Sequence, residues 1–437
     1  MTRHRRPRPL GLSLVLLFLF VATPAFPSGF QIMSQGAKAT GMGLAFSALA
    51  DDPTAIFYNP AGLGWQEHFS AEVGFMGISK IKGDFRGANP FPGVGSDGDQ
   101  HKTTFFIPTV FGVVPLTKDF NFGIGVFSQY GLGFRWDNPT DNPWPGRFIS
   151  ENAVIKSVDL NPVISWRLTP AISIAAGADY RLSYVQLQRN VGTYDPLNNA
   201  VVDTAYVKLD SDLWDNHGWG WNAGIMIRPS PVFSIGASYR SSITIDYAGS
   251  ATFTQLLTGN DVLDAIVRSR LPQGPQAVAT KIEFPATLNI GMAFVIAKNT
   301  TVCLEADWTQ WSDFNALNID FINPAIPDLD RITAWDDSWA YRFGVEQKIG
   351  PNWAIRSGYY RDNTPQPTRD VGPILADNDR DGYTLGVGYN TPKWGFNLSD
   401  LYLIVKDRTV DVPNTDSFFG KYRETVNIAI ASFRFSF

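Results

Sequence analysis

Hydrophobic and polar residues alternate over long stretches of this chain, and this alternation predicts strands. Between 172 and 184 every second residue is apolar or aromatic, and the intervening positions include Asp179 and Arg181. Successive side chains of a strand point to opposite faces, so each stretch has an apolar face and a polar face. The same pattern returns at 233–240 and in the closing residues 433–437, which carry a phenylalanine at every second position. Strands of soluble proteins usually run about 5–6 residues, whereas membrane-crossing strands need about 9–11.

Short turns and long polar segments alternate between these strands. Six short connections lie near 115–119, 167–171, 228–231, 297–299, 349–352 and 390–400. Seven long polar segments lie near 82–100, 135–152, 190–216, 248–278, 317–337, 362–381 and 408–421. Outer-membrane barrels have short periplasmic turns and long extracellular loops. The sequence therefore predicts an all-β fold, a transmembrane antiparallel β-barrel of about 14 strands occupying 68–437.

One long segment has apolar residues at helical spacing. Residues 261–268 read DVLDAIVR, and this spacing predicts a short amphipathic helix within an extracellular loop. The helix could contact substrate or serve only to pack the loop.

The N-terminus predicts export. Four arginines in the first eight residues precede an apolar run over 10–22 and the small residues near Ala25, the pattern of a cleaved signal peptide over 1–25. Charged residues make up only 18% of the chain and aromatic residues 14%, which also favours a membrane protein. The net charge of −5 disfavours nucleic acid as a partner. Cys303 is the single cysteine, so no internal disulfide can form.

The segment between the signal peptide and the first strand does not alternate. It is rich in glycine, alanine and serine, and we expect residues 26–67 to form a compact hatch inside the barrel. A barrel of this size would otherwise enclose a space, because interior width grows with strand number. On the last strand, Ile428 and Ile430 share the inner face with Ser432 and Arg434, so part of the lumen is expected to be apolar.

Several motifs make the chain similar to the FadL/TodX family of outer-membrane transporters of long-chain fatty acids and aromatic hydrocarbons. They span the mature chain and lie at 29–31, 50–52, 59–61, 129–132, 218–225, 239–241, 308–314 and 353–362. The resemblance implies a fourteen-stranded barrel plugged by a hatch, substrate capture by extracellular loops, and passive uptake at the bacterial outer membrane.

The resemblance also implies a sideways exit through the barrel wall at a kink in the third strand. The residues at this lateral opening are Gln129, Tyr130, Gly131, Leu132 and Gly133. Two of them are glycines, and glycine inside a strand often marks a bulge or a bend. Simple strand flexibility is the alternative interpretation.

Three residues are candidates for substrate binding. Arg189 matches the carboxylate-binding arginine of the family, and a charge-assisted bond from arginine is suited to a fatty acid. Asn318 stands where the fatty-acid carriers have lysine, so a weaker acid site or a neutral hydrocarbon is also consistent. Phe30, near the mature N-terminus, is expected to reach the pocket.

The hatch carries one more candidate motif. Asn59, Pro60 and Ala61 are expected to seat or gate the hatch, or to form only a tight turn.

Two other classes of function remain open: an outer-membrane enzyme acting on lipids, and an adhesive or structural barrel. The favoured transporter needs no catalytic residue, cofactor or metal. Residues 377–382 imitate the start of a calcium loop, but Gly388 stands where that loop needs glutamate, so a solvated turn is expected. The expected partners are a hydrophobic small molecule, outer-membrane lipids with lipopolysaccharide, and the barrel-assembly machinery acting through Phe437. We expect a monomer.

Overall fold

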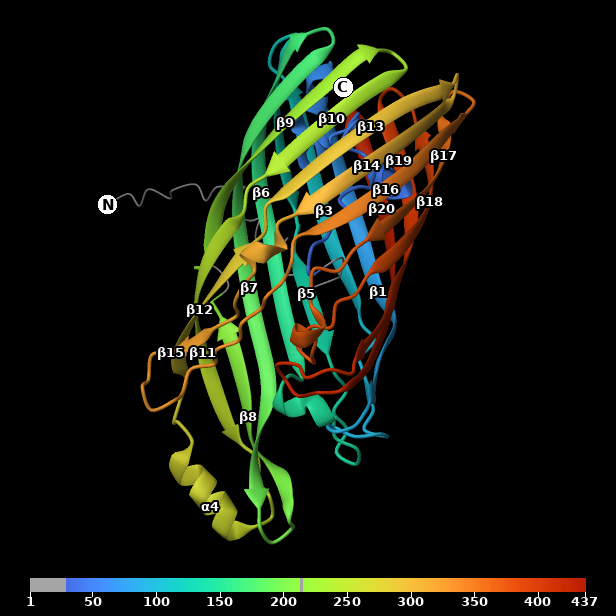
Figure 1. Ribbon diagram of the computed structural model, residues 1–437. Coiled ribbons are helices and arrows are strands. Elements are labelled where there is room, and N and C mark those ends of the chain that lie inside the picture. Colours follow the sequence, from blue (N-terminus) through green and yellow to red (C-terminus); the bar gives the residue numbers. More distant parts are fainter. Residues whose placement is uncertain (1–28, 213–214) are drawn as a thin grey trace, which may run out of the picture.

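The fourteen wall strands predicted from the sequence are present. The computed structural model describes residues 29–212 and 215–437 as a closed antiparallel barrel, shown in Figure 1. The predicted signal peptide, residues 1–25, lies outside the described residues. Several wall strands consist of two segments in line. The wall strands, in order, are β1 (Ser70–Gly87), β3 (Thr104–Pro115), β4 (Phe120–Phe127) with β5 (Gly131–Arg135), β6 (Asn152–Thr169), β7 (Ile172–Asp195), β8 (Ala200–Ser211) with β9 (His217–Ser230), β10 (Phe233–Arg240) with β11 (Ile243–Gln255), β12 (Gln276–Phe284) with β13 (Thr287–Ala297), β14 (Thr300–Thr309), β16 (Ser338–Ile349), β17 (Trp353–Asp362), β18 (Arg380–Asn390), β19 (Trp394–Val410) and β20 (Gly420–Ser436).

The first and last strands close the barrel. Strand β1 pairs with β20 from Ser70 opposite Ser436 to Gly87 opposite Gly420, with one irregularity near Ile81. The other edge of β1 pairs with β3. Closure leaves no free sheet edge along this seam, as the bilayer interior requires.

The alternation along the strands separates a lipid-facing surface from an inner surface. On β19 the side chains of Trp394, Phe396 and Leu398 are exposed, whereas Asn397 and Ser399 are buried. Ile428 and Ile430 are buried on the inner face, as predicted, but they pack in the cluster that includes hatch residues. The inner apolar surface of β20 therefore covers the hatch at this level.

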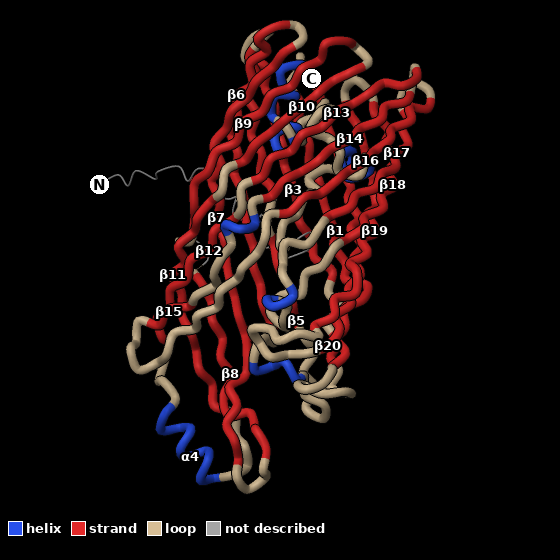
Figure 2. Tube along the Cα trace, in the orientation of Figure 1, coloured by secondary structure: helices blue, strands red, loops and turns tan. Residues whose placement is uncertain are grey.

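Short helices and two small strands complete the described chain. They are α2 (Ala37–Gly41), α3 (Ala55–Tyr58), α4 (Asp261–Arg270), the 3-10 helices η1 (Pro60–Trp65), η2 (Pro145–Phe148), η3 (Trp311–Asp313) and η4 (Thr368–Asp370), and the strands β2 (Gly98–Asp99) and β15 (Ile319–Phe321). None of the helices in the described ranges is long and apolar enough to cross a membrane. Figure 2 shows that most of this helix and loop structure lies inside the barrel or at its extracellular end.

The loop pattern agrees with the sequence at all but three places. The amphipathic helix is confirmed as α4, whose first turn is capped by the Asn260 side chain. The segment 190–216 is not a long loop, because β7 and β8 continue as a hairpin whose turn is 196–199. The connection expected over 390–400 is instead a tight turn at 391–393. Beyond the membrane a strand can carry polar residues on either face, so polarity misplaced the boundary at 190–216. At 390–400 the polar inner-face residues Asn397 and Ser399 masked the lipid-facing residues Phe396 and Leu398.

The third difference concerns the calcium-like sequence 377–382. It is not a solvated turn throughout, because Asp377 is buried and pairs with Arg380. The Asp377 carboxylate also accepts a hydrogen bond from the Thr364 hydroxyl at 2.5 Å.

Residues 29–65, called the hatch below, lie inside the barrel. Side chains of the wall fix it by donating hydrogen bonds to its backbone carbonyl groups. These bonds run from Asn121 to Leu63, Arg228 to Leu49, Ser234 to Ala48, Ser238 to Tyr58 and Thr384 to Gly41. Wall glycines allow the close approach: a Cβ at Gly344 would collide with the Met42 carbonyl, and one at Gly236 with the Ser47 carbonyl. The hydrogen bonds therefore fasten the hatch to four wall strands, β4, β9, β10 and β18.

Candidate functional site

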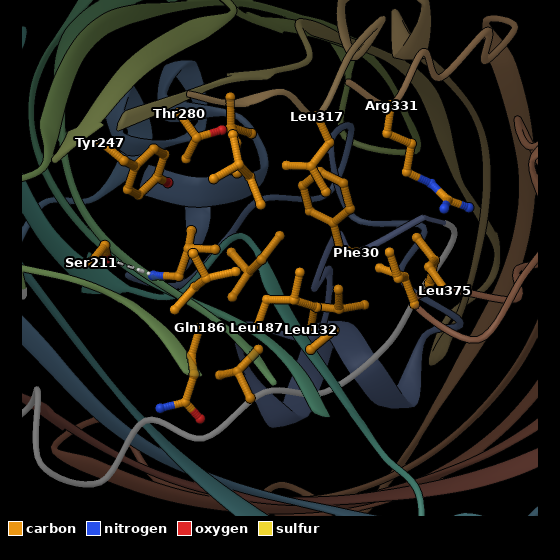
Figure 3. A pocket seen from close by; sticks show the side chains of 18 of the residues that line it. Phe30, Leu132, Gln186, Leu187, Ser211, Tyr247, Thr280, Leu317, Arg331 and Leu375 are labelled. Atoms are coloured by element: carbon orange, nitrogen blue, oxygen red, sulfur yellow. Dashed lines mark hydrogen bonds between the residues drawn. The ribbon is translucent and has the colours of Figure 1, made fainter. Parts of the chain in front are cut away.

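An apolar cavity lies between the extracellular loops and the hatch. Its empty space amounts to about 950 Å³, including the open mouth. Side chains from β5, β6, β7, β8, β11 and β12 line it together with residues of the loops around β15 and η4. Figure 3 shows Leu132 and Leu187 on one side, Leu317 and Leu375 on others, and Phe30 projecting into the centre. An apolar enclosure with few polar groups suits a hydrophobic ligand.

Phe30 connects the hatch to the cavity. Its side chain is fully buried and stacks edge-on against Trp311 and Phe314, with ring centroids 4.9 and 5.2 Å apart. The rings of Trp335 and Tyr130 also lie near it. The N-terminal end of the hatch is thereby part of the cavity wall.

A largely buried ion pair lies at one edge of the cavity, where three extracellular loops meet. Arg331 is the only cationic side chain among the described residues that line the cavity. Its two terminal nitrogens lie 2.7 and 2.8 Å from the two carboxylate oxygens of Asp416. Asp370, also in the lining, accepts a hydrogen bond from the Ala334 backbone at 2.8 Å. Burial alone would lower the pKa of Arg331, but its bonds to Asp416 outweigh this effect and raise the pKa, so the guanidinium stays charged.

The third wall strand is interrupted at residues 128–130, which separate β4 from β5. Phe127 pairs with Asp159 of β6, and Gly131 pairs with Lys156. Three residues on one strand thus oppose two on the other, which is the arrangement of a β-bulge. On the other side, β3 pairs with β4 only from Val110 onward, and among the described strand pairings β5 has β6 as its only partner. Pro108 of β3, which has no N–H to donate, lies two residues before Val110.

Side chains of neighbouring strands satisfy the polar groups that the interruption frees. Arg181 of β7 and Asp159 of β6 form a fully buried ion pair, with the Arg181 Nε 2.7 Å from Asp159 Oδ1. The same Arg181 donates to the Gln129 side chain at 2.7 Å, and the Gln129 backbone N–H reaches Asp159 at 3.3 Å. The Tyr130 backbone N–H donates to the Ser157 hydroxyl at 3.1 Å.

The hatch pairs with the same interruption. The Ile32 N–H donates to the Gln129 carbonyl at 2.6 Å, and the Gly131 N–H donates to the Phe30 carbonyl at 2.8 Å. One short segment of the hatch therefore contacts both the cavity, through the Phe30 ring, and the interruption, through its backbone.

Only one of the three predicted substrate-binding residues lies in the described wall of the cavity. Phe30 lines the cavity, but Arg189 and Asn318 do not. Arg189 is half-buried near the end of β7, opposite Val207. The exposed Asn318 accepts a hydrogen bond at its side-chain oxygen from the Arg331 backbone at 3.2 Å. Ligand contact by these three residues stays a prediction.

The predicted lateral-opening residues lie at or next to the interruption. Gln129 and Tyr130 belong to it, and Gly131, Leu132 and Gly133 form the start of β5. Leu132 also lines the cavity, so strand β5 borders both the cavity and the interruption. Their part in cargo exit stays a prediction.

The Asn59-Pro60-Ala61 motif is buried at the start of η1. The Asn59 side chain accepts from the Ala61 N–H at 3.1 Å and donates to the Ser47 and Ile225 carbonyls at 2.8 and 3.1 Å. It therefore caps a helix and joins two parts of the hatch to β9. Whether it gates the channel stays a prediction.

Sequence reasoning missed the charged groups around these sites. Asp179 and Arg181 were recognisable as opposite charges on the inner face of one strand, and the structure pairs them with Arg240 and Asp159 respectively. The Arg331–Asp416 pair had no comparable signal, because the two residues lie in loops 85 positions apart.

Known proteins resemble this chain along most of its length. A family model described as outer membrane protein transport protein (OMPP1/FadL/TodX) matches residues 18–437. A long-chain fatty acid transport protein of Salmonella typhi is 24% identical over 422 residues, covering 92% of this chain and 89% of that protein. Outer membrane protein P1 of Haemophilus influenzae is 22% identical over 441 residues, covering 89% of each.

Solved structures share the fold. A Pseudomonas aeruginosa FadL homologue matches with a TM-score of 0.77 at 20% identity, covering 94% of this chain and all of the other. The Pseudomonas putida toluene transporter TodX matches with a TM-score of 0.70 at 17% identity, covering 92% of this chain and 98% of the other.

Proposed function

The chain belongs to the OMPP1/FadL/TodX family of outer membrane transport proteins, and from this premise we propose that it is a channel for passive uptake of long-chain fatty acids or hydrocarbons. The observation that carries the proposal is the apolar cavity on the extracellular side of a fastened hatch, next to an interruption in the wall. The relatives named above for long-chain fatty acids and for toluene support this class of cargo.

The cavity would hold the cargo by burial of apolar surface. Its lining is mostly Leu, Ile, Val, Ala and aromatic side chains. Each methylene group that leaves water contributes about 0.8 kcal/mol. The cavity therefore favours long or bulky apolar molecules over small polar solutes.

The cargo would leave sideways, between β3 and β5, and enter the membrane directly. Two features support this route: the described strands β3 and β5 do not pair with each other beside the cavity, and the hatch, on the periplasmic side of the cavity, is fastened by hydrogen bonds from several strands. A route through the hatch to the periplasm would break these bonds and move an apolar molecule into water, which is unfavourable.

The proposal includes several further roles. Phe30 contacts the cargo, Arg189 and Asn318 assist at the cavity's approach, and the Asn59 motif seats the hatch. Gln129, Tyr130, Gly131, Leu132 and Gly133 border the exit. The outer wall contacts outer-membrane lipids and lipopolysaccharide, Phe437 is recognised by the barrel-assembly machinery, and the barrel acts as a monomer without a catalytic step.

Uptake by intact cells tests the proposal. Cells that lack their own carrier would express this protein, and its folding would be verified by heat-modifiable gel mobility. We expect a radiolabelled long-chain fatty acid, a radiolabelled hydrocarbon, or both to accumulate faster than in cells with an empty vector. A folded barrel that speeds neither cargo would contradict the proposed function.

A further inference from the structure

We propose that Asp416 determines the specificity of the cavity: by occupying Arg331 it excludes cargo with a carboxylate end and favours uncharged hydrophobic molecules. This inference rests on the proposed function, because it concerns the cargo of the same cavity.

The first step is the charge available to a ligand. An apolar molecule with a carboxylate end needs a charge-assisted hydrogen bond when it leaves water. Arg331 is the only cationic side chain among the described lining residues, so it is the one group of the lining suited to this task.

The second step is that this charge is already used. Both terminal nitrogens of Arg331 bond to both carboxylate oxygens of Asp416, at 2.7 and 2.8 Å. This fork-to-fork arrangement is the strongest and most specific contact between arginine and a carboxylate. The side chains are only 15% and 7% exposed, so water screens the pair weakly. A ligand carboxylate would have to displace Asp416 and leave it buried without its cation.

The third step is the sign of the remaining charges. The other charged residues of the lining are Asp370 and Asp210, and Asp210 already pairs with Lys208 at 2.7 Å, so Asp370 is the one that acts on Arg331. Asp370 is buried close to the pair, and Arg331 feels its charge. A ligand carboxylate at this edge would meet the like charges of Asp416 and Asp370, which disfavours its binding.

The pair is held in place by packing as well as by charge. A Cβ at Gly372 would collide with Asp416 and approach Arg331, so the backbone of a third loop closes over the pair. The Thr415 N–H next to Asp416 donates to the Arg369 carbonyl at 2.8 Å. These contacts keep Asp416 against Arg331 instead of leaving the cation free for a ligand.

A matched pair of ligands tests the inference on the purified full-length barrel in detergent. Dodecan-1-ol and dodecanoate have the same chain and differ at one end, and a mildly alkaline buffer keeps the acid ionised. Equilibrium dialysis of each radiolabelled ligand gives both dissociation constants. We expect the wild type to bind the alcohol at least about tenfold more tightly than the acid.

Substitution of the carboxylate should change this preference. In Asp416→Asn the size of the side chain is kept and Arg331 is freed, so the ratio of the two affinities should shift at least about tenfold toward the acid. The double variant Arg331→Gln with Asp416→Asn lacks the cation and should lose this gain. Asp97→Asn is the matched control, because Asp97 also pairs with an arginine, Arg86 at 2.7 Å, in an extracellular loop away from the cavity.

The outcomes separate the inference from the proposed function. A wild type that binds acid and alcohol equally, or an Asp416→Asn variant whose preference does not move, would overturn the inference and leave the proposed function intact. The same shift in the double variant would show that Arg331 is not the group involved and would also overturn it. A folded wild type that binds neither ligand would contradict the proposed function itself, and the inference with it.

Discussion

Replacing Arg181 by methionine should loosen the interruption of the third strand. The side chains of Arg181 and Asp159 are 1% and 0% exposed, and together they hold both the backbone and the side chain of Gln129. Arg181→Met leaves the Asp159 carboxylate buried without its cation, which typically costs about 3–5 kcal/mol. Because the pair is attached to Gln129, we expect this cost to favour conformations in which residues 128–130 detach.

The double variant Asp159→Asn with Arg181→Met measures the charge effect separately. It removes the uncompensated charge while the asparagine oxygen still accepts from the Gln129 N–H, so it should recover most of the loss. Lys421→Met is the control: Lys421 and Asp407 lie 2.5 Å apart but are 45% and 50% exposed, and such pairs contribute only about 0–1 kcal/mol.

Hydrogen exchange of the amides near Gln129, followed by mass spectrometry, is the assay. Three kcal/mol corresponds to roughly two orders of magnitude in an opening equilibrium. We expect exchange in Arg181→Met to rise by about that factor, and exchange in the double variant to stay within about tenfold of the wild type. Equal acceleration in the single and double variants, with both barrels folded by gel mobility, would refute the reasoning.

Three further predictions concern the hatch and the cavity. Gly344→Ala places a Cβ against the Met42 carbonyl, so the hatch should shift and ion conductance in planar bilayers should rise. Gly112→Ala is the control: its new Cβ would lie 3.8 Å from the nearest atom, on Ile124, so conductance should stay unchanged. Asn59→Ala removes a helix cap and two donated bonds, so proteolysis of the hatch should accelerate, by an amount reflecting about 1 kcal/mol or more. Asn59→Ser keeps an uncharged capping oxygen and should be affected less. Leu132→Trp fills part of the cavity, so dodecan-1-ol should bind more weakly to a barrel that still folds.

The barrel was predictable because the membrane imposes a simple code. A wall strand must present apolar side chains to lipid at every second position, as Phe396 and Leu398 do, and connections on one side must be short. Where the membrane ends, this code ends too. The β7–β8 hairpin was mistaken for a loop because its outer face is polar, as at Lys208 and Asp210, although Val207 and Leu209 alternate with these residues on the buried face.

The candidate site was predictable only in part, for a different reason. The resemblance to the family pointed to residues 129–133, with Gly131 and Gly133 as independent support, and the structure places the strand interruption at or next to them. Phe30 was a candidate because it lies near the mature N-terminus. The Arg331–Asp416 pair forms between loops whose conformations depend on packing, so neither residue type nor spacing indicates it. Pairings of this kind follow from the tertiary structure alone.

Deletion of Gln129 tests the central claim, the sideways exit, most directly. Residues 128–130 oppose only Ser157 and Val158, so removing one residue lets β4 and β5 pair continuously with β6 while the register on both sides stays the same. The account predicts that this variant folds and still binds cargo within about twofold of the wild type, but takes it up at least about tenfold more slowly in cells. Uptake at the wild-type rate through a barrel whose third strand is shown to be continuous would contradict the account.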